Sequence, residues 1–351
     1  MDPFRWRWTR WLVLGVVAGL AALLVGCCCA GSRLATGPAH RAALPEKLVL
    51  PVPAEVTAPS DSVTEVAMRN ILFHVDDDIR MRIRSLRGRM RDLRGGRVVV
   101  LDDKESLLLE IGDGELALGE EDLTLLLNRY VFGYPGSPLR GLVVRTSGNR
   151  IVQTGILHKI VDIPFEMTAT VSATPEGEIR IHPDVMKICG IDGMGLLRAV
   201  DASLADLLDL SGAKGVRVEE NDLLLDPLAI LPPPKLAGHL IGIRVEGKEL
   251  VQRFGSPEAE GIESLPPVVP APNYVYFRGG TIRFGKLYMV RAELEAIDLD
   301  DSDLFDFYLD YYATQLVAGY HVTTGTDALV AYMPDFAQSG AAVRPASGGA
   351  P

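Results

Sequence analysis

The hydrophobic pattern between residues 63 and 255 is mainly that of short β-strands. Runs rich in Val, Leu and Ile are separated by turn residues, among them Ser147-Gly148-Asn149 and Pro175-Glu176-Gly177. Apolar runs joined by such short turns are typical of antiparallel strands. The pattern predicts a meander of four strands over residues 141–182, with further strands on both sides of it.

Two stretches have a helical period instead. Apolar side chains recur at intervals of three and four over residues 121–131, and again over residues 194–210. This spacing places them on one face of an amphipathic helix. The apolar faces consist of Leu123, Leu126 and Leu127 in the first helix, and of Leu196, Leu197, Val200, Leu204, Leu207 and Leu208 in the second.

The composition changes beyond this β-rich domain of residues 63–255. A Pro-rich stretch, 256–272, is predicted to be a linker, and residues 273–336 are rich in aromatic side chains. The Gly, Ala, Ser and Pro residues of the tail, 337–351, predict disorder.

Within the aromatic-rich region we predict strands at 273–278 and 281–297, and a helix over 302–319. Tyr308 and Tyr312 follow the helical spacing of that segment, so we expect them to pack in the core. All these elements together predict an α+β fold, in which a mostly antiparallel, curved β-sheet wraps around amphipathic helices. A small aromatic-rich α+β region follows it.

The N-terminal segment has the pattern of a bacterial lipoprotein signal. Arg5, Arg7 and Arg10 precede an apolar run, and Leu24-Val25-Gly26-Cys27 fits a lipobox. The pattern predicts a signal peptide at 1–26, lipid attachment at Cys27 and an Ala- and Pro-rich spacer at 27–62.

The same segment leaves a second interpretation open, a single-pass transmembrane helix. Residues 11–30 carry no charge, and about twenty such residues suffice to span a bilayer. In both interpretations the arginines stay on the cytoplasmic side. We therefore expect a membrane-anchored protein of the bacterial cell envelope, with its folded part on the periplasmic side.

Composition and charge exclude two broad classes. The 351-residue chain is 48% hydrophobic and 23% charged, which excludes disorder of the whole chain. Its net charge of −11 argues against a general nucleic-acid binder, which needs basic surface to displace counterions. We expect no nucleic-acid partner.

Catalytic and metal-binding motifs are almost absent from the sequence. There is no Gly-Lys-Ser/Thr phosphate loop, no His-Glu-x-x-His and no Gly-x-Ser-x-Gly, and the six His are scattered singly. The acidic run from Asp298 to Asp303 begins like a calcium loop, but it lacks the required Gly and the bidentate Glu. We interpret it as a solvated turn and expect no cofactor and no metal.

Arg80, Arg82 and Arg84 alternate with apolar residues, so one face of the predicted strand carries guanidinium groups. Such a face could hold lipid phosphates at an anionic surface. The alternative is a solvated face balanced by nearby carboxylates.

The order of helix, meander, helix and further strands resembles the tubular lipid-binding (TULIP) superfamily, and within it the bacterial LmeA-like phospholipid-binding proteins. The resemblance covers about residues 100–255 and includes Leu223-Leu224-Leu225-Asp226-Pro227, Leu231-Pro232 and the strand at 238–245. It implies a curved sheet around helices and a phospholipid-binding groove. The lining of that groove is inferred from periodicity and consists of the nine helical positions named above.

Three functions remain open from the sequence. The first is non-catalytic binding of phospholipid or another lipid in an apolar groove. The second is a structural or scaffolding lipoprotein with a filled core, which binds a protein partner through its aromatic C-terminal region. The third is an envelope hydrolase that uses carboxylates such as Asp298, Asp300, Asp303 and Asp306.

Overall fold

The computed structural model describes residues 63–159, 161–199, 201–255 and 265–339. Strands make up 53% of these residues and helices 14%. The fold is mostly β, with two large sheets and a few short helices. The predicted α+β fold, with a sheet wrapped around amphipathic helices, was therefore wrong.

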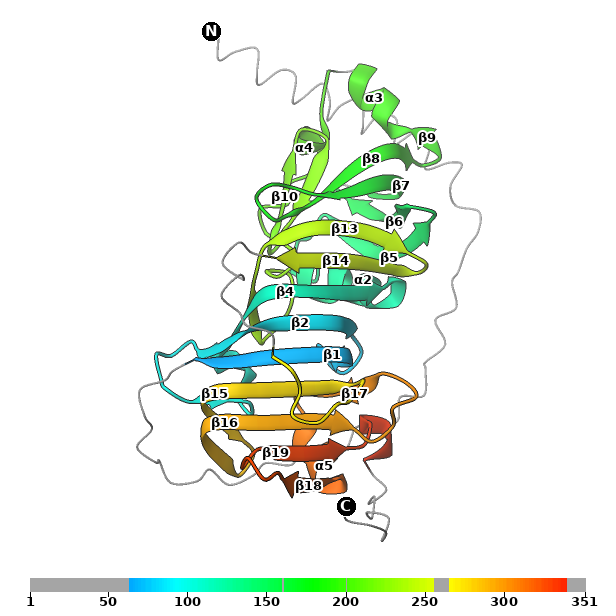
Figure 1. The fold of residues 1–351 in the computed structure, drawn as a ribbon. Helices are drawn as coiled ribbons and strands as arrows, with labels where there is room; N and C mark the ends of the chain where they lie inside the picture. The colour runs from blue at the N-terminus through cyan, green and yellow to red at the C-terminus, as the bar shows by residue number, and fades with distance from the viewer. Residues whose placement is uncertain (1–62, 160, 200, 256–264, 340–351) are drawn as a thin grey trace.

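The larger sheet contains strands from both the β-rich region, 63–255, and the aromatic-rich region, 273–336 (Figure 1). Residues of the N-terminal part pair directly with those of the aromatic-rich part, because β1 lies between β2 and β15. From edge to edge the sheet contains β13 (Leu240–Glu246), β14 (Glu249–Gly255), β4 (Leu107–Gly119), β2 (Arg80–Asp92), β1 (Thr64–His74), β15 (Tyr274–Phe284), β16 (Leu287–Asp298), β19 (Leu329–Met333) and β18 (Tyr320–Thr323). Three short strands pair in parallel at its flanks: β12 (Lys235–Ala237) with β4, β17 (Phe305–Phe307) with β1, and β3 (Val99–Val100) with β15.

The smaller sheet contains the predicted meander. Its strands β5 to β8 are consecutive and antiparallel, so the four-strand prediction is confirmed. From edge to edge it contains β10 (Val216–Glu219), β11 (Asp222–Leu225), β8 (Ile179–Ile188), β7 (Asp162–Ala173), β6 (Arg150–His158) and β5 (Leu139–Ser147), and β9 (Ile191–Asp192) pairs with β8. Strand β13 of the larger sheet contacts β7, so the two sheets adjoin there.

The first predicted helix is present, and the second is broken. Helix α2 (Glu120–Leu126) continues into the π-turn η2 (Leu127–Val131). In place of a helix over 194–210 there are α3 (Gly193–Ala199) and the single turn α4 (Leu204–Leu207).

Local capping explains the break. Asp201 has a φ of 52°, in the left-handed region. Ser203 is extended and starts a new helix, because its side chain and that of Asp206 form a reciprocal capping box. Leucine spacing alone does not reveal such a restart.

The predicted C-terminal helix is also shorter than expected. Phe305 and Phe307 are buried at alternate positions of β17, which pairs with β1, and helix α5 spans only Tyr312–Ala318. Two one-turn helices complete the described elements, η1 (Lys104–Ser106) and η4 (Phe336–Gln338). Tyr308 and Tyr312 are 1% and 2% exposed, so their predicted packing in the core is confirmed.

Among the described residues, no helix is long and apolar enough to cross a membrane. The transmembrane-helix prediction is contradicted for this part of the chain. The stretch at 11–30 that suggested it, and Cys27, lie outside the described residues.

Helix α2 takes the place of a neighbouring strand along the edge of the smaller sheet. Strand β5 pairs with β6 on one side only, so half of its backbone groups need other partners. Side chains at intervals of four on α2 and η2 supply partners for three of them. The bonds run from the N–H groups of Thr146, Val144 and Leu142 to Oε1 of Glu120, Oγ1 of Thr124 and Oδ1 of Asn128, at 2.7, 2.9 and 2.9 Å.

Asn128 bonds both backbone groups of Leu142, since its Nδ2 also donates to the carbonyl oxygen of Leu142 at 2.7 Å. Replacing Asn128 with Ala removes both bonds and leaves the β5 groups without partners. We expect the free energy of unfolding to fall by roughly 2–3 kcal/mol. Urea unfolding measures the change.

Asn149→Ala, at an exposed turn position, is the matched control, and its free energy of unfolding should lie within about 0.5 kcal/mol of the wild type. Equal losses in both variants would contradict the role of Asn128.

Candidate functional site

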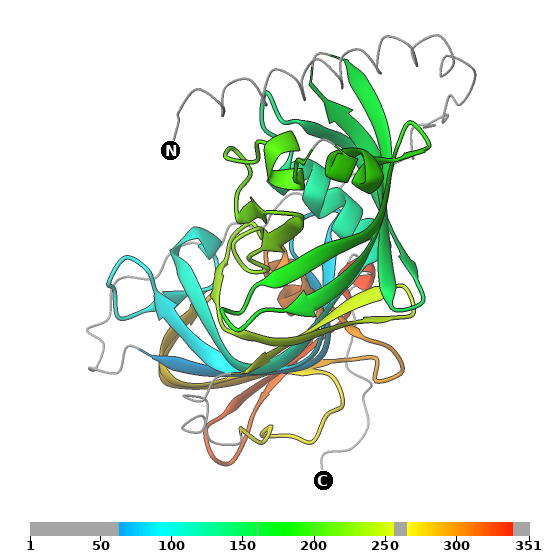
Figure 2. The ribbon, with the colours of Figure 1, turned by 90° about the horizontal axis from the view of Figure 1, so that it is seen from above.

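The segment that links the two sheets, residues 226–238, forms one wall of a cleft. It follows β11 and ends beyond β12, which pairs in parallel with Leu108, Leu109 and Glu110 of β4. The Oδ1 atom of Asp226 accepts hydrogen bonds from the backbone N–H groups of Leu228 and Ala229, both at 3.0 Å, and fixes the first turn. In Figure 2 this yellow-green segment runs beside the cyan strands and the short cyan helix η1.

Three consecutive prolines, Pro232 to Pro234, make this wall chemically unusual. Proline has no backbone N–H and a fixed φ, so this part of the wall is rigid and offers apolar rings and carbonyl acceptors without donors. A hydrocarbon chain can contact such a wall without leaving a buried N–H unsatisfied. In the sequence this stretch entered only through Leu231-Pro232, as part of the resemblance to lipid-binding proteins.

The cleft itself has a volume of about 590 Å³. Its lining combines apolar residues with four charged ones, Glu105, Lys214, Asp226 and Lys235. The residues are Leu93, Glu105, Lys214, Asp226, Leu228, Ala229, Leu231, Pro232, Pro233, Pro234, Lys235, Leu236, Ala237 and Gly238. They come from the loop after β2, from η1, from the turn before β10 and from the linking segment.

A second, apolar cavity lies behind the same wall. It has a volume of about 30 Å³, and it shares Leu231, Leu236 and all three prolines with the cleft. Its inner side consists of core residues of β1, β2 and β4, with Val75 of the turn between β1 and β2: Met68, Phe73, Val75, Met81, Ile83, Leu86, Leu109 and Leu116. The proline segment therefore separates an open cleft from a small void over the large sheet.

The structure brings together only some of the groove residues inferred from periodicity. Leu204, Leu207 and Leu208 line an apolar cavity of about 40 Å³ between α4 and the inner face of the smaller sheet. Leu123, Leu126 and Leu197 are buried in the main core, with Leu127 packed against it. Leu196 on α3 is half-buried, and the side chain of Val200 lies outside the described residues. A cavity of about 40 Å³ has room for a few water molecules, and a whole acyl chain does not fit it.

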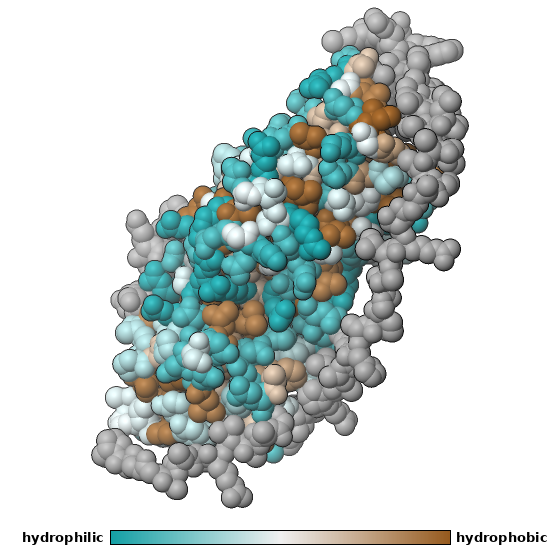
Figure 3. Space-filling view, turned by 90° about the vertical axis from the view of Figure 1, so that its right-hand side faces the viewer, coloured by the Kyte–Doolittle hydropathy of each residue, from teal (hydrophilic) through white to brown (hydrophobic). Residues whose placement is uncertain are grey.

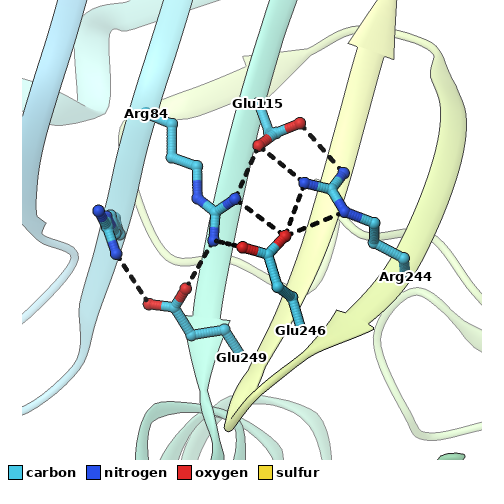
Figure 4. A network of polar contacts seen from close by, with 6 residues as sticks. Arg84, Glu115, Arg244, Glu246 and Glu249 are labelled. Atoms are coloured by element: carbon cyan, nitrogen blue, oxygen red, sulfur yellow. Dashed lines mark hydrogen bonds and ion pairs between the residues drawn. The ribbon is translucent and has the colours of Figure 1, made fainter. Parts of the chain in front are cut away.

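The predicted alternation on β2 is present, and it belongs to an ion-pair network (Figure 4). Arg84 donates to Glu115, Glu246 and Glu249 at 2.9–3.1 Å, and Arg244 bonds Glu115 and Glu246. Arg82 pairs with Glu249 at 3.7 Å. Hydrogen bonding to Glu246, and then to Glu249 and Glu115, outweighs burial and raises the pKa of Arg84.

Three arginines and three glutamates thus balance one another on this face of the sheet. This matches the alternative of a face neutralised by carboxylates, although the carboxylates come from β4, β13 and β14. Arg80 lies exposed at the start of β2. A role of these arginines at a lipid surface stays a prediction.

The acidic run at the end of β16 forms a turn in which Asp301 and Asp303 are exposed as predicted, whereas Asp298 at its start is buried. Asp298 and Asp335 are 2% and 7% exposed, and their carboxylate oxygens lie within 4.8 Å of those of Asp303. Backbone N–H groups of Asp300 and Asp306 donate to Asp298 and Asp335, at 3.0 and 2.8 Å. Carboxylates are ligands that hard cations use, but these hydrogen bonds explain the cluster as a loop closure. None of the three residues lines the cavities described above, and Asp300 and Asp306 do not join the group.

Surface apolarity on one side of the molecule is divided into separate patches. Figure 3 shows brown groups interrupted by teal polar residues outside the grey atoms. A long apolar ligand finds no continuous apolar surface on that side, so a recess is a better place for it. The cleft under the proline segment is such a recess.

Comparisons with known proteins add no functional information: no family model, no curated protein and no solved structure matches the chain. The resemblance to lipid-binding TULIP proteins stays a prediction. The role of the cleft is argued from its own residues.

Buried Asp298 gives the fold a measurable pH dependence. Burial, and then the nearby charge of Asp335, raise the pKa of Asp298 from 3.8 to about 7. A carboxyl with a raised pKa stabilises the folded state while it is protonated, and this contribution is lost as the pH rises through about 7. The wild type should therefore become less stable between pH 5.5 and 8.5.

Replacing Asp298 with Asn removes the ionisation, so the variant should lose roughly 2 kcal/mol less over that interval. Urea unfolding at both pH values, with a chelator present, measures the difference. Asp301→Asn, an exposed position of the same turn, is the control and should follow the wild type. Parallel pH profiles for all three proteins would contradict the assignment.

Proposed function

We propose that this protein binds a single lipid in the cleft under the proline segment, without catalysis. The observation that carries the proposal is the pairing of a cleft of about 590 Å³ with an apolar cavity behind five of its own lining residues. Small-molecule sites typically have volumes of about 300–1,000 Å³, mostly apolar walls and a few polar groups. The cleft has all three properties.

The wall favours a hydrocarbon over a polar ligand. Leu228, Leu231 and Leu236 supply aliphatic surface, and the prolines supply no donor. Each methylene that leaves water contributes about 0.8 kcal/mol, so a chain of moderate length gains enough to bind. No Ser, Thr, Cys or His lines the cleft, and binding alone needs none.

The cavity behind the wall gives the site room to adapt. Met68 and Met81 line it, and methionine fills irregular space because its side chain is unbranched and flexible. The end of a lipid chain could enter by moving these two side chains. The core strands would stay paired.

We also propose that the protein is anchored to a membrane of the bacterial cell envelope. This proposal rests on the sequence of the N-terminal segment, where three arginines precede an apolar run and a lipobox at Cys27. A tether beside a bilayer keeps the cleft close to a supply of lipid.

A scaffolding lipoprotein is the second candidate, and the small cavities favour it. The voids of about 30 and 40 Å³ indicate that the core around them is well filled. In this function the cleft would stay empty, and a protein partner would bind elsewhere on the surface.

The test is a single substitution at the mouth of the cleft. Leu93 is 43% exposed there, and Leu93→Asp places a charge where the lipid chain would lie without changing the core. We expect the affinity of the full chain for a fluorescent dodecanoyl probe to fall roughly tenfold. Leu287→Asp is the matched control, because Leu287 is 38% exposed at the start of β16 and does not line the cleft; this variant should bind the probe like the wild type.

Native mass spectrometry of the purified wild type gives an independent result. A lipid mass that co-purifies with the protein, and that Leu93→Asp reduces, supports lipid binding. Absence of both co-purified lipid and probe binding in the wild type overturns the proposal and favours the scaffold.

A further inference from the structure

We infer that Lys214 and Lys235 make this cleft selective for a lipid whose head carries an anionic group, a phosphate or a carboxylate. The inference rests on the proposed function and adds the chemical class of the ligand. It comes from the charged residues that line the cleft, whereas lipid binding itself was argued from the apolar wall.

The two lysines differ from most of the cationic groups around them. Arg91 pairs with Glu110, and Arg94 pairs with Asp103, both close in sequence to cleft residues. Lys214 and Lys235 are exposed on the cleft lining. Among the described residues, the side chain of neither lysine forms a hydrogen bond or an ion pair.

The carboxylates of the cleft do not neutralise these lysines by contact. Asp226 is bound to the N–H groups of the turn that it caps. Glu105 is exposed on η1 and forms no ion pair among the described residues. Two cations and two carboxylates leave the cleft with a formal charge of zero on a chain of net charge −11.

Because the charges of the cleft cancel, a ligand with one anionic group in direct contact with a lysine suits it better than a broad anionic surface such as a charged bilayer. Long-range attraction to a charged bilayer needs an excess of basic residues, and the cleft has none. A lysine ammonium at the mouth can reach an anionic oxygen while its aliphatic stem lies along the apolar wall. An amphiphile with its chain on the prolines and its anionic head in contact with a lysine ammonium satisfies both the apolar and the charged residues of the cleft.

The experiment compares two amphiphiles with the same chain. Dodecyl phosphate carries an anionic head and dodecyl maltoside a neutral one, and both are used as monomers in competition with the dodecanoyl probe on the full chain. We expect the wild type to bind dodecyl phosphate roughly tenfold more tightly. The double variant Lys214→Glu with Lys235→Glu should lose that preference and bind dodecyl maltoside like the wild type.

A control variant separates local contact from net charge. Lys248 and Lys286 are exposed in turns away from the cleft, and replacing both with Glu changes the net charge by the same amount. This variant should keep the preference for dodecyl phosphate. Thermal unfolding of each variant checks that the fold is retained.

The outcomes distinguish the inference from the proposed function. Equal binding of both amphiphiles to the wild type overturns the head-group selectivity and leaves lipid binding intact. Binding of neither amphiphile overturns both. Inorganic phosphate that competes as well as dodecyl phosphate would make the ligand a free anion, which also overturns the inference.

Discussion

Backbone hydrogen bonding along β1 is the constraint on which the rest of the structure depends. One edge of β1 pairs with β2 from Thr64 to His74, and the other edge pairs first with β15 and then with β17. The change of partner falls at Asn70, which has a φ of 52° and whose Nδ2 donates to the carbonyl oxygen of Pro272. Asparagine tolerates this left-handed conformation better than most residues. Strands more than two hundred residues apart are thereby held in one sheet.

The cleft is a consequence of how the two sheets are connected. The chain must pass from β11 of the smaller sheet to β12 on the larger one, and prolines in that passage cannot donate to either sheet. The passage therefore lies over the core residues of β1, β2 and β4 without pairing until Lys235. A wall that packs without hydrogen bonding leaves space on both sides, a large cleft outside and a small void inside.

The charged residues of the cleft differ in their partners from those on the face of the large sheet. On the outer face of the large sheet, arginines and glutamates of neighbouring strands bond one another, as the group around Arg84 does. Exposed pairs of this kind contribute little individually to stability, but they remove free cationic groups from the surface. The side chains of Lys214 and Lys235 have no such partner among the described residues, and the proposed head-group selectivity rests on them.

Features that depend on residues close together in the sequence could be predicted, and features that depend on contacts between distant segments could not. The meander, the helix that begins near Glu120 and the apolar side of β2 follow from spacing within a few residues. The break after α3 and the strand at Phe305 depend on a cap and on a pairing partner, which spacing does not specify. The cleft was missed for the same reason: its residues come from four separate segments, and only pairing between distant strands brings them together. Periodicity is a property of neighbours in the chain, whereas the site is a property of neighbours in space.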